Sequence, residues 1–188
     1  MERTQLERAS WAYTHLRGLT AIPGGLVAIV LALGNWEAGP FASDLVVVAT
    51  VAVLAAAFLL IDREYRRRYG SMTPVPGSEL RSRLAFWVVV ALVTVGSTVM
   101  YELDLAINPL AVVTPIAFVA SLSISRALRP HTLVIWGAVL VAGLLPVWHG
   151  PPDPGNVALV MCGLAWIAGG LLDHLAFTRV FSAPALDA

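Results

Sequence analysis

The sequence predicts an all-α fold, a polytopic transmembrane helical bundle of six spans with both termini in the cytoplasm (N-in/C-in). Hydrophobic residues make up 58% of the 188 residues and charged residues only 13%, and the mean hydropathy is +0.78. Soluble domains of this size contain more charge and less apolar content. The apolar residues also form long runs that are separated by polar connections. Together these observations exclude a soluble enzyme, a disordered chain and a disulfide-stapled secreted domain.

Six stretches approach the roughly 20 apolar residues that a helix needs to cross the hydrocarbon core. They cover approximately residues 19–34, 41–61, 84–103, 107–125, 132–148 and 156–177 of a single transmembrane domain, residues 1–188. Helices are the only spanning structure that fits, because β-barrel alternation is absent and backbone groups in lipid must bond within their own segment. Tryptophans near the span ends are expected to anchor the helices at the headgroup level. These are Trp36 and Trp148 at the outer ends and Trp11, Trp87 and Trp136 at the inner ends.

Residues 1–18 precede the first span and are expected to form an amphipathic helix at the inner interface. The apolar positions at helical spacing are Leu6, Ala9, Tyr13 and Leu16. The alternative is a polar tail. We expect the first span to be retained rather than cleaved as a signal peptide, because the charged region before it is long and includes Glu2 and Glu7.

The positions of the basic residues predict the orientation. All 12 basic residues are arginines, and they fall in the N-terminal segment, the second and fourth connections and the C-terminal tail. Since positive loops stay inside, this pattern predicts N-in/C-in insertion in the plasma membrane. Arginine without lysine is compatible with a GC-rich bacterial genome, so a bacterial inner membrane is expected. The formal net charge of zero gives no nucleic-acid signature.

The cytoplasmic loop 62–83 is the most distinctive segment. Opposite charges stand at helical spacing, Asp62 with Arg66 and Glu64 with Arg67 and Arg68. We therefore expect the second helix to continue about two turns beyond its span and to end at Gly70, a suitable C-terminal cap.

The arginines of this loop are candidate docking residues for a cytoplasmic protein partner or for anionic membrane lipid. They are Arg63, Arg66, Arg67, Arg68, Arg81 and Arg83. The alternative is an ordinary topogenic loop, which is solvated and only fixes the orientation.

The third span has a polar stripe whose spacing of three and four places it on one helical face. With the acids at its outer end, the candidate cavity residues are Thr94, Ser97, Thr98, Tyr101, Glu102 and Asp104. The stripe would descend about 12 Å into the membrane at 1.5 Å per residue. It would line an outward-facing cavity. The alternative is that the hydroxyls bond back to carbonyls in their own helix and allow close packing.

Small residues recur in the first and last spans and allow helices to approach closely. They are Gly24, Ala28 and Ala32 in the first span and Gly163 and Gly170 in the last. This pattern predicts either a tight bundle or the seam of a homodimer, and it does not separate the two.

Residues with the chemistry for metal binding or catalysis are few. The lone Cys162 lies in an apolar run, which indicates a buried, inert thiol. The four histidines have no diagnostic ligand spacing, so we expect them to be solvated at the interface. Phosphate-binding loops and nucleophile elbows are absent. We therefore expect no catalytic residue, no metal and no cofactor.

Two short segments are similar to a known group of proteins. Residues 65–74 end in a Tyr-Gly-x-x-x-Pro sequence, and the last span closes with Gly169-Gly170-Leu-Leu-Asp173-His174. Both resemble uncharacterised small multi-spanning bacterial integral membrane proteins. The resemblance covers about a sixth of the chain and implies a small integral membrane protein with no particular chemistry.

The functional expectation follows from the arginine-rich inner face. We expect a non-enzymatic accessory or regulatory component that docks a partner there. The alternative is a small transporter or channel subunit that uses the polar stripe of the third span. An intramembrane enzyme ranks lowest, since it would need Asp62, Asp173 and either His131 or His174 within reach of one metal ion.

Overall fold

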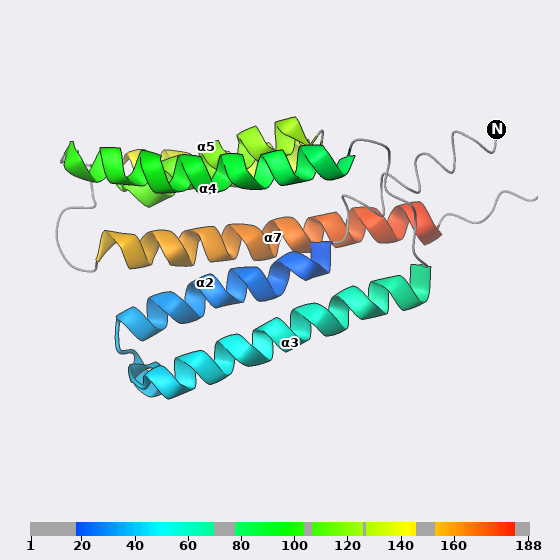
Figure 1. The fold of residues 1–188 in the computed structure, drawn as a ribbon, viewed down its shortest axis with the longest axis horizontal. Coiled ribbons are helices and arrows are strands. Elements are labelled where there is room, and N and C mark those ends of the chain that lie inside the picture. Colours follow the sequence, from blue (N-terminus) through cyan, green and yellow to red (C-terminus); the bar gives the residue numbers. More distant parts are fainter. Residues whose placement is uncertain (1–17, 70–77, 104–106, 126, 146–152, 183–188) are drawn as a thin grey trace, which may run out of the picture.

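The computed structural model describes residues 18–69, 78–103, 107–125, 127–145 and 153–182, and its fold is all-helical, as predicted (Figure 1). The helices are α2 (Ala21–Asn35), α3 (Asp44–Tyr69), α4 (Ser78–Glu102), α5 (Pro109–Ile124), α6 (Pro130–Leu144) and α7 (Pro154–Ser182). Short 3-10 turns, η1 (Gly18–Thr20) and η2 (Gly39–Ala42), precede α2 and α3. The described residues contain no strand. The predicted interfacial helix at residues 1–18 lies, except for Gly18, outside the described residues.

Within the described residues, four helices are long and apolar enough to cross a membrane, which indicates a membrane protein by length and composition. These segments are Gly18–Asn35, Asp44–Arg68, Leu80–Met100 and Pro154–Arg179. The apolar helices α5 and α6 are shorter, with 16 and 15 residues. At 1.5 Å per residue they are about 24 and 22 Å long, less than the roughly 30 Å of a hydrocarbon core.

The observed helix bounds differ from the predicted spans at the two ends of α3 and at the end of α7. Helix α3 begins at Asp44 rather than at residue 41, because Gly39, with a positive φ of 55°, and Pro40 form the η2 turn first. Its other end reaches Tyr69, as the charge spacing predicted, while Gly70 lies outside the described residues. The last helix continues to Ser182, beyond the predicted span end at residue 177.

Helix α7 occupies the middle of the bundle (Figure 1). Helix α2 packs along one side of α7, and α3 packs on α2. Helices α5 and α6 pack on α7, and α4 packs on α5. This order places α3 and α4 at opposite edges, where most of their apolar side chains are exposed.

Glycines bring the backbones of α2 and α7 together along one seam. A Cβ atom on Gly25 would lie 2.5 Å from the carbonyl oxygen of Gly163, and one on Gly18 would lie 2.0 Å from that of Gly170. Only glycine fits at such distances. A Cβ atom on Gly24, which the sequence pattern grouped with Ala28 and Ala32, would lie 3.9 Å from the ring of Trp166 on α7, an ordinary contact distance. The small residues therefore close the bundle within one chain.

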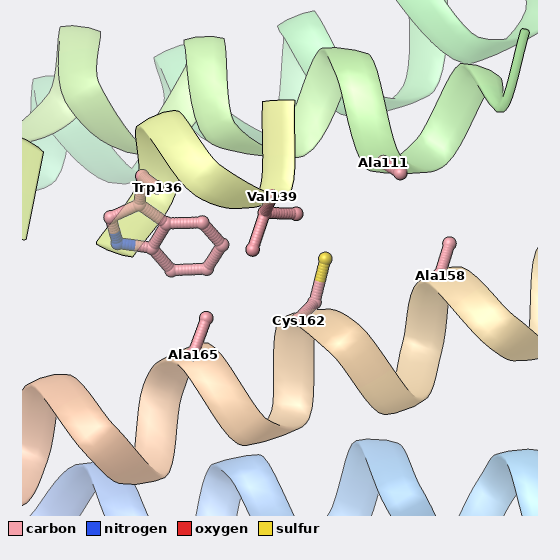
Figure 2. Packing of buried hydrophobic residues seen from close by; sticks show 6 residues of the cluster. All are labelled: Ala111, Trp136, Val139, Ala158, Cys162 and Ala165. Atoms are coloured by element: carbon pink, nitrogen blue, oxygen red, sulfur yellow. The ribbon is translucent and has the colours of Figure 1, made fainter. Parts of the chain in front are cut away.

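A cluster of buried residues fills the space between α7 and the α5–α6 pair (Figure 2). It comprises Ala111, Trp136, Val139, Ala158, Cys162 and Ala165. Cys162 is buried, as predicted. The prediction that Trp136 anchors a helix at the interface was wrong: its side chain is only 4% exposed and stacks on Phe118 at 4.7 Å between ring centroids. Aromatic burial in the core outweighed the interfacial preference of this indole.

Candidate functional site at the arginine end of the bundle

The described arginines gather at one end of the bundle, which we call the arginine end. Successive helices run antiparallel, so the end of α3, the start of α4, the start of α6 and the end of α7 all lie there (Figure 1). The arginines are Arg63, Arg66, Arg67, Arg68, Arg81, Arg83, Arg129 and Arg179. At the opposite end the charged residues that the structure describes are all acidic, namely Glu37, Asp44, Glu102 and Asp153.

The last turns of α3 present several exposed guanidinium groups. The side chains of Arg66, Arg67 and Arg68 are 65%, 79% and 68% exposed. The predicted intrahelical ion pairs are present: Arg66–Asp62 at 2.5 Å, Arg68–Glu64 at 2.5 Å and Arg67–Glu64 at 3.6 Å. Such exposed pairs stabilise a helix only slightly. Their main effect is to keep α3 helical beyond the apolar segment.

Two adjacent residues of α7 connect this helix to its neighbours on both sides. Asp173 Oδ1 accepts a hydrogen bond from Arg129 Nη1 and lies 2.8 Å from His131 Nε2. His174 Nδ1 lies 2.7 Å from the hydroxyl of Tyr65 on α3. Adjacent residues on a helix point about 100° apart, so Asp173 reaches the start of α6 while His174 reaches α3.

These bonds correct the expectation that the histidines are solvated. His131 and His174 are partly buried and each has a protein partner; His15 and His149 lie outside the described residues. The described residues contain no group of three metal-ligating side chains. Asp62, the third residue that an enzymatic metal site would need, is paired with Arg66. The cluster around Asp173 thus has the contacts of a structural ion pair between helices.

A cavity of about 210 Å³ lies at the arginine end, where η1, α3 and α7 meet; we call it the polar cavity because four of its six lining residues carry a polar or charged group. Its lining residues are Leu19, Ile61, Glu64, Tyr65, Arg68 and His174. The Tyr65 side chain is only 4% exposed and packs edge-to-face on Phe177 at 5.3 Å between ring centroids. Sequence reasoning missed Tyr65, because it stands in an arginine run. The available signal was that it continues the apolar positions of Phe58 and Ile61 at helical spacing.

The polar stripe predicted on the third span is divided between two surfaces of α4. Thr94 and Thr98 are exposed, and the Thr98 hydroxyl donates to the Thr94 carbonyl at 2.9 Å, which is the alternative weighed for this stripe. Ser97 is buried beside Gly96, whose Cβ position would lie 2.9 Å from Val113 of α5. Glu102 is exposed at the helix end. The Tyr101 side chain and Asp104 lie outside the described part, and the cavity stays a prediction.

Asparagines join the helices at the end of the bundle opposite to the arginine end, which we call the acidic end. The fully buried Asn108 donates from its backbone N–H to the carbonyl of Gly143 at 2.9 Å and from Nδ2 to the carbonyl of Pro154 at 2.5 Å. Asn35 Nδ2 donates to Asn156 Oδ1 at 2.8 Å. Asn108 and Asn156 are buried, whereas Asn35 is exposed. Buried amides with such partners fix helix positions, so this cluster is structural.

Comparisons with protein-family models, with curated proteins and with solved structures found no match for this chain. The resemblance to uncharacterised bacterial membrane proteins therefore stays a prediction, and the functional argument depends on the geometry of the arginine end alone.

Proposed function

We propose that this chain is an accessory or regulatory component of a bacterial plasma membrane that docks an acidic surface of a cytoplasmic protein through its arginine end. The observation that carries the proposal is the segregation of charge. All eight arginines that the structure describes lie at one end, together with only four of the described acidic residues, Asp62, Glu64, Glu79 and Asp173. Positive segments stay in the cytoplasm, which favours N-in/C-in insertion.

Six crossings are favoured by the way the two short helices begin and end. Asn108, which caps α5, bonds to Pro154 at the acidic start of α7. Arg129, which precedes α6, bonds to Asp173 near the other end of α7. Since α5 and α6 thus connect the same two ends as α7, the proposal counts both as spans. A locally thinned bilayer accommodates such short helices at modest cost.

The extension of α3 supports docking over a purely topogenic role. From Ile61 to Tyr69 the helix advances about 12 Å at 1.5 Å per residue, so Arg66 and Arg67 stand beyond the apolar segment. Fixing the orientation in the membrane requires positive charge in this segment, but it does not require a rigid helix that presents the charge. Preorganised arginines on a helix favour recognition of carboxylates, because less side-chain freedom is lost per bond formed.

Replacing Arg66 and Arg67 together by glutamine is expected to reduce the recovery of a crosslinked cytoplasmic partner about tenfold, since two exposed charge contacts of up to about 1 kcal/mol each are lost. The measurement is photo-crosslinking of the full chain in host membranes, followed by quantification of the adduct. Arg179→Gln, an exposed arginine at the same end outside the docking set, serves as the control and retains the adduct. Equal recovery from the double variant and the wild type, with both inserted, contradicts the proposal.

A further inference from the structure

Two hollows follow one another along the seam between α2 and α3. The first is an apolar groove of about 340 Å³, which we call the seam groove. Its lining residues are Pro23, Gly24, Val27, Val51, Leu54, Ala55, Phe58 and Leu59. The second is the polar cavity at the arginine end, to which η1 and α3 both contribute.

The two hollows share one face of α3. A row of lining positions advances along this helix in steps of three and four residues: Val51, Leu54, Phe58, Ile61, Tyr65 and Arg68. Positions spaced by three and four residues lie on one helical face. On the other side of the seam the lining runs in the opposite direction, from Val27 through Pro23 to Leu19. The two hollows therefore follow one line along the seam, which is about 26 Å long at 1.5 Å per residue.

The chemistry of this path changes from one end to the other. The seam groove is lined by apolar side chains and one glycine, and its wall is open to the surroundings because Ala55, Phe58 and Leu59 are exposed. The polar cavity adds the guanidinium of Arg68, the carboxylate of Glu64 and the hydrogen-bonded pair of Tyr65 and His174. An apolar channel that ends in polar groups matches an amphiphile, with its chain in the groove and its head in the cavity.

The charge around the polar cavity favours an anionic head. Both carboxylate oxygens of Glu64 face arginines, Oε1 toward Arg68 and Oε2 toward Arg67. The last turns of α3 around the cavity carry four arginines, Arg63, Arg66, Arg67 and Arg68, and two acidic residues, Asp62 and Glu64, so the net charge of this segment is positive. Planar guanidinium groups bind phosphate oxygens in bidentate geometry. The cavity also lies at the end of an apolar helix segment, at the level where headgroups begin.

We propose that the seam between α2 and α3 holds one anionic glycerophospholipid of the inner leaflet, with an acyl chain in the seam groove and the phosphate in the polar cavity beside Arg68 and Tyr65. The inference uses the orientation in the proposed function, with the arginine end inward, but not the protein partner. Basic pockets between transmembrane helices on the cytoplasmic side bind lipid headgroups by this chemistry.

Filling the seam groove tests the acyl-chain half of the proposal. The full chain is purified in detergent and delipidated. It is then titrated with phosphatidylglycerol or with phosphatidylcholine, and bound lipid is counted by native mass spectrometry. The wild type is expected to bind one phosphatidylglycerol in preference to phosphatidylcholine. Ala55→Trp is expected to lower phosphatidylglycerol occupancy at least about fivefold, since the indole takes the space of the buried methylene groups.

The matched control is Ala56→Trp, which is also exposed but points about 100° away from Ala55 on the same helix. It retains the lipid. Equal occupancy in both variants, or equal binding of both lipids to the wild type, overturns the proposal.

A second pair of variants tests the headgroup half and separates it from protein docking. Arg68→Gln is expected to abolish the preference for phosphatidylglycerol, whereas Arg66→Gln, which does not line the cavity, leaves it unchanged. Loss of the lipid from Ala55→Trp, a position outside the docking arginines, with normal crosslinking of a protein partner supports this inference independently of the proposed function. Retention of the lipid preference in Arg68→Gln contradicts the inference even if protein docking is confirmed.

Discussion

Gly25→Ala is expected to destabilise the folded chain by about 2–3 kcal/mol, because the added methyl would meet the backbone of α7 rather than a flexible side chain. Its Cβ would lie 2.5 Å from the carbonyl oxygen of Gly163 and 2.8 Å from Ile167. Relief requires α2 and α7 to separate along the seam that defines the middle of the bundle. The measurement is the free energy of unfolding in a reversible denaturing-detergent titration.

The control for this substitution is Gly137→Ala on α6. A Cβ atom at Gly137 meets nothing within 4 Å, so the variant gains helix propensity at no steric cost. We expect its stability to be unchanged or up to about 1 kcal/mol higher. Unfolding free energies that agree between the two variants would show that the α2–α7 seam is not closely packed.

Asp173→Asn is expected to lower the free energy of unfolding by about 2 kcal/mol. The substitution leaves Arg129 beside a neutral amide in a site of limited solvent access. The side chains of Arg129 and Asp173 are only 11% and 24% exposed. Breaking a fully buried ion pair costs about 3–5 kcal/mol of stability. The loss expected for Asp173→Asn is smaller, because Asp173 is partly exposed. The loss also weakens the bond to His131 and frees the start of α6 from α7.

The matched control is Asp62→Asn, whose partner Arg66 is 65% exposed. This variant should lose no more than about 1 kcal/mol, the range of exposed ion pairs. A cycle with Arg129→Gln isolates the coupling between Arg129 and Asp173. If the double variant is as unstable as the sum of the two single variants, the ion pair does not join α6 to α7.

Features that depend on local sequence could be predicted. The apolar runs indicated every helix, and opposite charges at helical spacing predicted that α3 continues past its apolar segment, as it does to Tyr69. Helix α3 begins at Asp44 and not at the predicted residue 41. This difference also has a local cause, since Gly39 and Pro40 form a 3-10 turn. The sequence confines arginine to alternate connections, and the helix ends next to these connections lie at one end of the bundle.

Features that depend on which helix faces meet could not be predicted. A helix in lipid is apolar all round, so periodicity does not distinguish its packed face from its lipid-facing one. For this reason the small-residue pattern of the first span singled out Gly24 and not Gly25, and Trp136 was placed at the interface rather than in the core. The bond between Tyr65 and His174 joins residues 109 positions apart, and no short-range pattern encodes it.

The central claim is that the chain crosses the membrane with its arginine end in the cytoplasm, and labelling the two ends of α3 tests it most directly. Asp44 and Arg66 are exposed near opposite ends of this helix and lie about 33 Å apart at 1.5 Å per residue. Single cysteines at Asp44→Cys and Arg66→Cys, in a Cys162→Ala background, are treated with a membrane-impermeant maleimide on intact cells. We predict labelling at position 44 from outside and at position 66 only after permeabilisation; labelling of position 66 from outside would contradict the account.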